Sequence, residues 1–233
     1  MKRVIGYIFT LLILVGIAYA VYLFAPRAPE TSISSSTGTS STMEQGTEIQ
    51  VTDVYDSTAA YRVEARYPQF GIPAADEKIK EVVDKTIAEF KAYPTNPPDS
   101  STSQNEFIGS FNSVYVGPDI VSVALSFSAD TGGAHPNTNI VSVSVNVRTG
   151  KELTLDDALA LIGKTLPQVT NDSLVQLRTE LGADLIFPDG AKPVAENYGT
   201  FLVSADKVTF VFNNYQVAPY SAGQQQVWFK RVK

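Results

Sequence analysis

The chain of 233 residues contains no cysteine and a single histidine, so its composition excludes several kinds of active site. A disulfide scaffold needs paired cysteines, a thiol nucleophile needs one, and a zinc cluster draws three or four ligands mainly from cysteine and histidine. We therefore expect no metal and no cofactor. Hydrophobic residues make up 44% of the chain and charged residues 18%, which is typical of a globular protein with about one domain or two small ones.

Common catalytic motifs are also missing from the sequence. It has no Gly-x-Ser-x-Gly, no His-Glu-x-x-His, no Gly-Lys-Ser/Thr phosphate loop and no dinucleotide fingerprint. Residues 204–207 match the Ser-x-x-Lys pattern of penicillin-binding enzymes, but there the serine must begin a helix. Here the four residues separate two strand-like runs, so we expect a hairpin turn without catalytic function.

One long apolar run is present near the amino terminus. Residues 4–24 contain no charge, and 21 residues at about 1.5 Å each would span about 30 Å of hydrocarbon as a helix. A cleaved signal peptide is the alternative, because Ala18-Tyr-Ala20 mimics a cleavage site, although this run exceeds the usual 7–15 residues by about a third or more. Lys2 and Arg3 precede the run, which predicts a cytoplasmic stub of residues 1–3 and an extracytoplasmic remainder.

Residues 25–48 are rich in Ser, Thr, Pro and Gly and read as a tether. This leaves residues 49–233 as the folded domain, with a subdomain break that could fall near residues 93–105. Residues 1–48 contain three basic residues (Lys2, Arg3 and Arg27) and three acidic ones (Glu30, Glu44 and Glu48), so their charges cancel. The net charge of −6 therefore belongs to the domain. An acidic exterior domain favours a cationic partner over nucleic acid or anionic lipid.

Hydrophobic periodicity predicts an α+β domain with a mostly antiparallel sheet covered by helices. Strands are expected at residues 61–67, 107–116, 120–129, 140–148, 201–204, 208–212 and 227–232, and helices at 74–92, 154–162 and 166–181. Pro68 should end the first strand. The strands at 120–129 and 140–148 alternate valine with serine, which predicts one core face and one solvated face. Thr154 and Asp157 have the spacing of a capping box.

Candidate functional residues lie in two loops. His135 follows Gly132 and Gly133 between the two best strands, where paired glycines allow positive φ; we expect a structural or ligand-contacting loop. Tyr215 and Tyr220 lie in a second loop rich in Asn, Tyr and Gly, residues suited to stacking and adaptable polar contact.

Pairs of acids offer a further candidate, since two facing carboxylates could hydrolyse a glycoside. The candidates are Asp156 with Asp157 and Glu180 with Asp184. Adjacent acids at a helix start more commonly act as caps and partners of the helix dipole.

Five separated segments together resemble one family. They are Tyr67-Pro-Gln-Phe70, Gly132-Gly-Ala-His-Pro136, Arg148-Thr-Gly-Lys-Glu-Leu-Thr-Leu-Asp-Asp157, Phe201-Leu-Val-Ser204 and Tyr215-Gln-Val-Ala-Pro-Tyr-Ser-Ala-Gly223. In this order they resemble the RsiV-like domain, also called PdaC N-terminal-like, of bacterial exported proteins, over residues 50–231. The family includes a membrane-bound anti-sigma factor whose exterior part binds lysozyme, and a peptidoglycan deacetylase.

The resemblance implies an exterior domain that works at the cell wall by binding. The three residues before the apolar run are too few to hold a sigma factor, and the chain lacks the metal-binding catalytic domain of a deacetylase. We therefore expect a membrane-anchored, non-enzymatic binding module for peptidoglycan or a lysozyme-like cationic protein, with ligand contacts at Gly132, Gly133, His135, Tyr215 and Tyr220. A cell-envelope hydrolase is the alternative, and a purely structural assembly protein is a third class.

Overall fold

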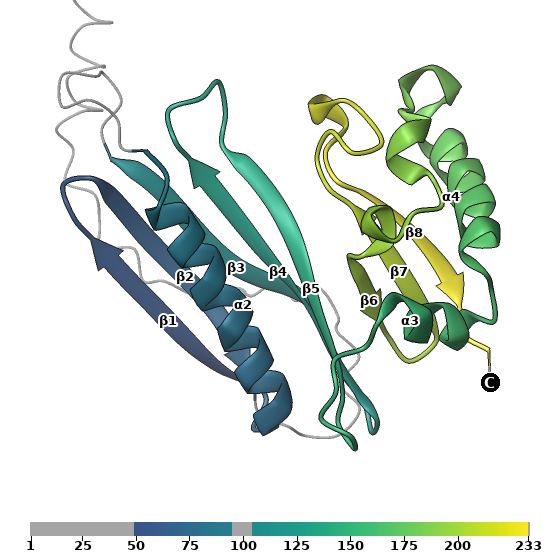
Figure 1. Ribbon diagram of the computed structural model, residues 1–233, viewed down its shortest axis with the longest axis horizontal. Helices are drawn as coiled ribbons and strands as arrows, with labels where there is room; N and C mark the ends of the chain where they lie inside the picture. The colour runs from purple at the N-terminus through teal and green to yellow at the C-terminus, as the bar shows by residue number, and fades with distance from the viewer. Residues whose placement is uncertain (1–48, 95–103, 233) are drawn as a thin grey trace, which may run out of the picture. The chain divides into compact units, whose positions relative to one another are not determined.

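The computed structural model describes residues 49–94 and 104–232, whose fold is built on two β-sheets (Figure 1). The first sheet has the order β1-β2-β3-β4-β5 and the second β6-β7-β8. The strands are β1 (Gln50–Ser57), β2 (Tyr61–Gln69), β3 (Asn105–Val116), β4 (Ile120–Asp130), β5 (Asn137–Asn146), β6 (Phe201–Val203), β7 (Lys207–Phe212) and β8 (Gln225–Lys230). The helices are α2 (Pro73–Lys91), α3 (Leu155–Ile162) and α4 (Leu166–Leu181). The α+β class predicted from the sequence is confirmed.

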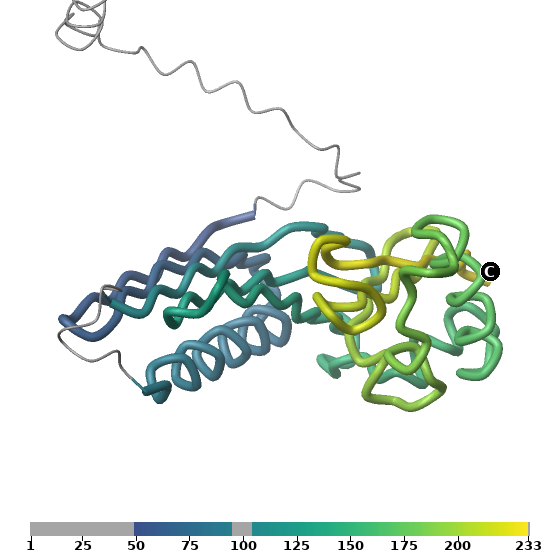
Figure 2. The backbone as a smooth tube through the Cα atoms, turned by 90° about the horizontal axis from the view of Figure 1, so that it is seen from above, coloured from purple at the N-terminus to yellow at the C-terminus, as the bar shows by residue number. Residues whose placement is uncertain are grey.

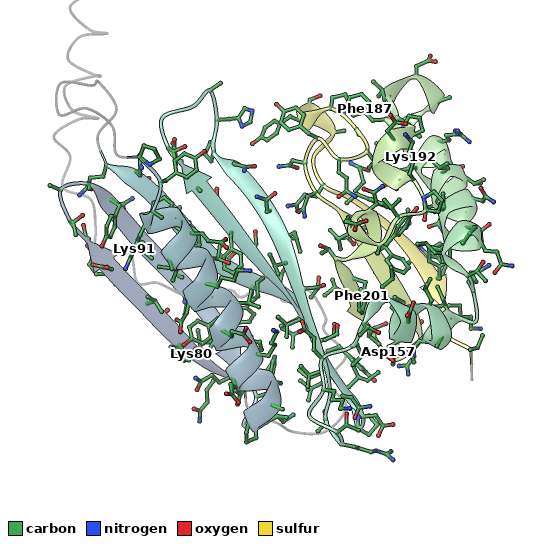
Figure 3. All side chains as sticks on the ribbon, in the orientation of Figure 1. Lys80, Lys91, Asp157, Phe187, Lys192 and Phe201 are labelled. Atoms are coloured by element: carbon green, nitrogen blue, oxygen red, sulfur yellow. The ribbon has the colours of Figure 1, made fainter. Side chains whose placement is uncertain are left out.

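The first sheet is mixed, whereas the sequence predicted one mostly antiparallel sheet. β2 and β3 pair in parallel, from Tyr61 opposite Asn105 to Ala65 opposite Gly109, and the other three pairs are antiparallel. Parallel neighbours need a long crossover, and the connection between β2 and β3 contains α2. The helix lies along one face of the sheet (Figures 1 and 2) and buries Ile79, Val83 and Phe90 in the same cluster as Val63 of β2.

The amino-terminal edge of this sheet departs from the sequence prediction in two ways. β1 was not expected, and Pro68 lies inside β2 instead of ending it. Pro68 pairs only with Val51 of β1, because the pairing of β2 with β3 ends at Ala65. A proline is tolerated there since one side of the strand needs no backbone donor.

The second sheet and the two shorter helices surround a second core. Val208, Phe210 and Phe212 of β7 are buried with Val227 and Phe229 of β8. The capping box at the start of α3 is confirmed, because the Thr154 side chain accepts from the Asp157 N–H while the Asp157 carboxylate accepts from the Thr154 N–H. Gly182 ends α4 with φ of 84°, as expected. Four short 3-10 helices complete this half: η1 (Ala183–Leu185), η2 (Pro188–Ala191), η3 (Ala195–Tyr198) and η4 (Tyr220–Ala222).

Serines join the two sheets, and here the predicted solvated face is wrong for β4. The Ser122 hydroxyl is fully buried, lies 2.8 Å from the Ser144 hydroxyl and accepts from the Val203 N–H at 3.0 Å. The Ser142 hydroxyl accepts from the Phe201 N–H at 2.9 Å. Both N–H groups belong to β6, the edge strand of the second sheet, so the first sheet satisfies the donors that this edge would leave unpaired.

The predicted membrane anchor cannot be compared with this fold. Residues 1–3, 4–24 and 25–48 lie outside the described residues, as does most of the break expected near 93–105. Within residues 49–94 and 104–232, no helix is both long and apolar enough to cross a bilayer.

Candidate functional site

The His135 loop is the tip of the hairpin between β4 and β5. Asp130 ends β4, and its side chain accepts a hydrogen bond from the Gly132 N–H at 3.0 Å, which tightens the turn. Gly132 has φ of 84°, a conformation that glycine adopts without strain, as the sequence predicted for this loop. Gly133 has no positive φ, and a Cβ there would meet only the His135 carbonyl oxygen at 3.7 Å. Of the two glycines, only Gly132 is required by its backbone conformation.

The second loop, residues 213–224, connects β7 to β8 and is fixed to the first sheet by Asn213. The Asn213 carboxamide accepts from the Ile140 N–H at 2.7 Å and donates to the Ile140 carbonyl at 3.1 Å. Ile140 lies on β5, an edge strand, so the side chain pairs with the exposed edge as a neighbouring strand would. The neighbouring Asn214 donates to the Thr138 carbonyl at 3.4 Å. These bonds bring the loop beside the β4–β5 hairpin (Figure 1).

The structure brings three of the predicted site residues into one aromatic cluster. The rings of His135 and Tyr220 stack with centroids 3.7 Å apart and planes 20° from parallel. Tyr215 completes the cluster, with its centroid 5.4 Å from that of Tyr220 and 6.1 Å from that of His135. We call His135, Tyr215 and Tyr220 the aromatic cluster below. His135 and Tyr215 are separated by 80 positions in the sequence, so the cluster forms only in the folded chain.

Hydrogen bonds fix the orientation of these rings. The Nδ1 atom of His135 lies 3.0 Å from the Pro136 carbonyl, which can only accept, so Nδ1 carries the proton of this bond. In the neutral imidazole the other nitrogen, Nε2, then accepts from the Tyr215 hydroxyl at 3.2 Å. The Tyr220 hydroxyl donates to the same Pro136 carbonyl at 3.3 Å. Both ring nitrogens are therefore engaged with neutral oxygen atoms.

Tyr215 occupies a strained and exposed position. Its φ of 65° is in the left-handed region, which costs a residue with a Cβ about 1 kcal/mol or more. Its side chain is nevertheless 57% exposed, so burial of the ring does not offset this cost. Residues held in such a conformation are concentrated at functional sites, where the backbone strain sets the direction of a side chain.

The loop is held on its other side by the 3-10 helices. The Gln216 carboxamide donates to the carbonyls of Gly190 and Asn197, each at 3.0 Å, and accepts from the Asn213 N–H. A Cβ at Gly190 would overlap the Gln216 backbone carbonyl, so this close approach requires glycine. Beneath the contact, burial raises the pKa of the Tyr198 hydroxyl, which donates to the Ala191 carbonyl. The aromatic cluster is thus attached to both halves of the fold.

The cluster presents a surface suited to stacking. His135 forms no ion pair with any residue that the structure describes. A general base needs a ring nitrogen directed at a substrate proton, and a catalytic triad adds a nucleophile on one side of the imidazole and a carboxylate on the other. The cluster instead offers flat aromatic faces and hydroxyl groups, which suit contact with a ring-shaped, hydroxylated ligand.

The Ser-x-x-Lys match forms no catalytic dyad. Ser204 and Lys207 close the turn between β6 and β7, where the Ser204 hydroxyl accepts from the Lys207 N–H and donates toward Asp206. The hairpin turn predicted from the sequence is confirmed.

The paired acids occupy structural positions. Asp156 and Asp157 lie in the first turn of α3, and hydrogen bonds from Thr154 hold the pKa of the Asp157 carboxyl below its usual range. Glu180 lies in the last turn of α4 and Asp184 in η1, and both are exposed. Over the described ranges, no group of three or more His, Asp or Glu side chains is placed to hold a metal ion.

Sequence reasoning did not identify the residues that position the cluster. Asn213 and Gln216 flank Tyr215 and anchor it to β5 and to the 3-10 helices. Their signal in the sequence was weak: asparagine after a strand commonly marks a turn, and nothing in the pattern shows a partner 73 positions away. The exposed Trp228 on β8 was also not considered.

The chain is similar to one protein family and to one curated protein. Residues 155–231 match the family described as "Protein of unknown function (DUF3298)". The chain is 22% identical over 189 residues to the peptidoglycan-N-acetylmuramic acid deacetylase PdaC of Bacillus subtilis. The aligned region covers 78% of this chain and 40% of that protein. The chain therefore spans less than half the length of this curated relative.

Two solved structures are similar to this chain. A DUF3298 family protein of Pseudomonas aeruginosa superposes with a TM-score of 0.55 and 17% identity, over 80% of this chain and 91% of that one. A DUF3298 family member of Bacteroides fragilis gives a TM-score of 0.49 and 16% identity, over 78% and 90% of the two chains. At these identities the first of the two supports the fold alone.

Proposed function

Because this chain carries a DUF3298 domain and is distantly similar to PdaC, we propose that it is a non-catalytic binding module that contacts the glycan of peptidoglycan through the aromatic cluster. PdaC is a deacetylase of peptidoglycan by its name, and its similarity extends over 78% of this chain. A domain without catalytic groups could still bind peptidoglycan, as the deacetylase must, while not catalysing the deacetylation. We further propose that residues 4–24 anchor the module in the membrane, with residues 49–233 on the extracytoplasmic side.

The observation that supports this proposal most strongly is the placement of Tyr215. The chain maintains an unfavourable backbone conformation to present a 57% exposed aromatic ring beside the stacked pair of His135 and Tyr220. The apolar C–H face of a pyranose packs against such a ring, while hydroxyl groups at the edge of the cluster exchange hydrogen bonds with the sugar. The imidazole and phenol groups, which form no ion pair with any residue that the structure describes, suit an uncharged N-acetylated sugar.

Retention of the full chain on insoluble peptidoglycan tests this proposal. We expect Tyr215→Asn to weaken retention about tenfold or more, because it removes an exposed aromatic ring of the cluster. Asparagine tolerates positive φ better than tyrosine does, so this variant should unfold at the same temperature as the parent or slightly higher. Tyr55→Asn is the matched control, since Tyr55 is 70% exposed on β1, outside the aromatic cluster. Equal loss in both variants, or none in either, would contradict the assignment.

A cationic protein partner, such as a lysozyme-like protein, is a second candidate that the net charge of −6 on residues 49–233 favours. Its signature differs from that of glycan binding. Retention on immobilised lysozyme should fall steeply with added salt, whereas stacking on a neutral sugar should not. Release of sugars or acetate from peptidoglycan during the same incubation would instead support a cell-envelope hydrolase and overturn the binding-only proposal.

A further inference from the structure

Trp228 is the only tryptophan of the chain and lies on the outer face of the second sheet. Along β8 the side chains alternate, so that Val227 and Phe229 enter the core while Trp228 and Lys230 point away from it. The indole is 57% exposed. The two loops of the aromatic cluster lie elsewhere, and no contact joins Trp228 to any member of that cluster in the part of the chain that the structure describes.

Two lysines share this face with the indole. In the register of β7 and β8, Lys207 lies directly opposite Lys230 and Thr209 directly opposite Trp228, and opposite residues project to the same side of a sheet. The Lys207 ammonium lies 6.0 Å from the centre of the Trp228 ring, at the outer limit of a cation–π contact. We call Lys207, Trp228 and Lys230 the cationic face.

The charge arrangement of the cationic face is unfavourable for the protein alone. Like charges directly opposite each other on a sheet are destabilising. Six of the seven other lysines in the described ranges are paired with acids, Lys151 being the exception: they are Lys78, Lys80, Lys85, Lys91, Lys164 and Lys192. Within residues 49–94 and 104–232, neither Lys207 nor Lys230 forms an ion pair. Two unpaired ammonium groups therefore adjoin an exposed aromatic ring in a domain whose net charge is −6.

The backbone beneath the cationic face is held rigid. The Gln176 carboxamide of α4 accepts from the Trp228 N–H and donates to the Trp228 carbonyl, each at 3.2 Å. At the other end of the face, Leu202 and Val211 are buried against Ala124 and Ile140 of the first sheet. The face is thus bounded on one side by the sheet junction and supported at Trp228 by a helix, which presets the direction of the indole.

We propose that the cationic face binds an acidic polysaccharide, with a sugar ring stacked on Trp228 and a sugar carboxylate between Lys207 and Lys230. Aromatic contact supplies the interaction with the C–H face of the ring, and the two ammonium groups supply the charge complementarity that the protein itself lacks. Thr209 and Gln226, which lie on the same face by register, supply hydrogen-bonding groups beside the indole. A lipid surface would meet these polar side chains with no extended apolar area around the single indole. This site is distinct from the aromatic cluster and its existence does not depend on peptidoglycan binding.

The single tryptophan provides a direct measurement. The full chain in neutral detergent is titrated with oligogalacturonate while the fluorescence of Trp228 is followed. We expect a saturable change in emission whose midpoint rises with salt, because two screened ionic contacts contribute to the affinity. A neutral maltooligosaccharide of equal length should require at least about tenfold more ligand, the combined value of two ion pairs of about 0.7 kcal/mol each.

Substitutions separate a binding role from a structural one. The double variant Lys207→Gln with Lys230→Gln should weaken binding about tenfold, at about 1.4 kcal/mol per factor of ten, and remove its salt dependence. Each single substitution should leave the thermal stability unchanged or raise it, because it relieves the repulsion between the two lysines. Lys85→Gln is the control, because Lys85 is exposed on α2 and far from β8 in the sequence. It should change neither the affinity for oligogalacturonate nor the thermal stability.

Three results would overturn the proposal. The first is an emission that does not respond to oligogalacturonate, and the second is an equal response to the neutral sugar. The third is a response to micelles that contain phosphatidylglycerol but not to either sugar, which would identify the cationic face as a lipid-contacting surface. A loss of stability in Lys207→Gln without loss of binding would show that Lys207 acts only on the fold through its contact with the indole.

Discussion

Replacing Ser122 with alanine removes one oxygen atom from the junction of the two sheets. Ser122 is fully buried, and its hydroxyl is shared between the Val203 N–H of β6 and the Ser144 hydroxyl of β5. Alanine fills nearly the same volume, so little cavity forms and the change acts on hydrogen bonding. After the substitution, the Val203 N–H remains buried against the first sheet without its acceptor.

Removing only one partner of a buried hydrogen bond costs more than removing both, because the remaining partner stays buried without a hydrogen bond. A buried donor left unpaired costs about 1–3 kcal/mol, and the lost bond to Ser144 adds about 1 kcal/mol. We therefore expect Ser122→Ala to lower the free energy of unfolding by about 2–4 kcal/mol. For a domain of this length the melting temperature should fall by about 4–16 °C.

Urea denaturation followed by circular dichroism and by the fluorescence of Trp228 measures this loss. Ser126→Ala is the matched control, because Ser126 lies on the same face of the same strand but is only half-buried. It lies opposite Ile140 of β5 and takes no part in the hydrogen bonds of Ser122. Its effect should stay within about 0.5 kcal/mol. Ser144→Ala should give an intermediate loss of about 1 kcal/mol, since Val203 keeps its acceptor. Equal effects of Ser122→Ala and Ser126→Ala would refute the role assigned to the serine junction.

Three further substitutions test the anchors of the fold and site. Asn213→Ala removes both hydrogen bonds to β5, so it should lower the free energy of unfolding by about 2 kcal/mol and weaken peptidoglycan retention. Asn214→Ala removes one long hydrogen bond and should cost under about 0.5 kcal/mol. Denaturation measures the stability of the two variants, and the retention assay measures their binding. Gly190→Ala should lower the melting temperature by several degrees, about 2 kcal/mol of strain, whereas Gly199→Ala, whose Cβ would make only ordinary van der Waals contacts, should not. Asp157→Asn should destabilise by about 0.5 kcal/mol at neutral pH, a value reduced by solvent exposure. The lowered pKa of the Asp157 carboxyl means that its contribution is present above the ordinary aspartate pKa and is lost as pH falls through the folded pKa, so the two unfolding curves should converge in acid. A difference that persists there would contradict this account.

Local patterns in the sequence were sufficient where one element determines its own structure. The period-two valines of β4 and β5 and the capping box at Thr154 specify a strand or a helix start without reference to the rest of the chain. For this reason the α+β class and the boundaries of α3 and α4 were predicted within about two residues.

Pairing between distant segments could not be predicted in the same way. Alternation in β2 and β3 is compatible with either direction of pairing, and the parallel arrangement depends on the crossover through α2. The serines of β4 were predicted to face solvent because hydroxyls usually do. Ser122 instead bonds the backbone N–H of Val203 on β6, 81 positions later in the chain, and no periodicity in β4 contains that information.

The candidate site was predicted in part for a related reason. The residue types in the loops of His135 and Tyr215 indicated stacking, but the contact between the two loops depends on Asn213 and its bonds to Ile140. Gly133 was proposed with Gly132 on the basis of the same motif, yet only Gly132 has the backbone conformation that requires glycine. A motif marks a loop, and hydrogen bonds to other elements decide which of its residues are constrained.

The separation of His135 and Tyr215 in the sequence determines when the aromatic cluster can form during synthesis of the chain. The β4–β5 hairpin can form as soon as its own residues are available, whereas the ring partners of His135 arrive only after 80 or more further residues have been made. Closure of so long a segment is slow compared with formation of a hairpin. A chain that is cut or stalled before Tyr215 would leave His135 without either ring partner. The aromatic cluster therefore forms late in folding, only after both halves of the domain have been made.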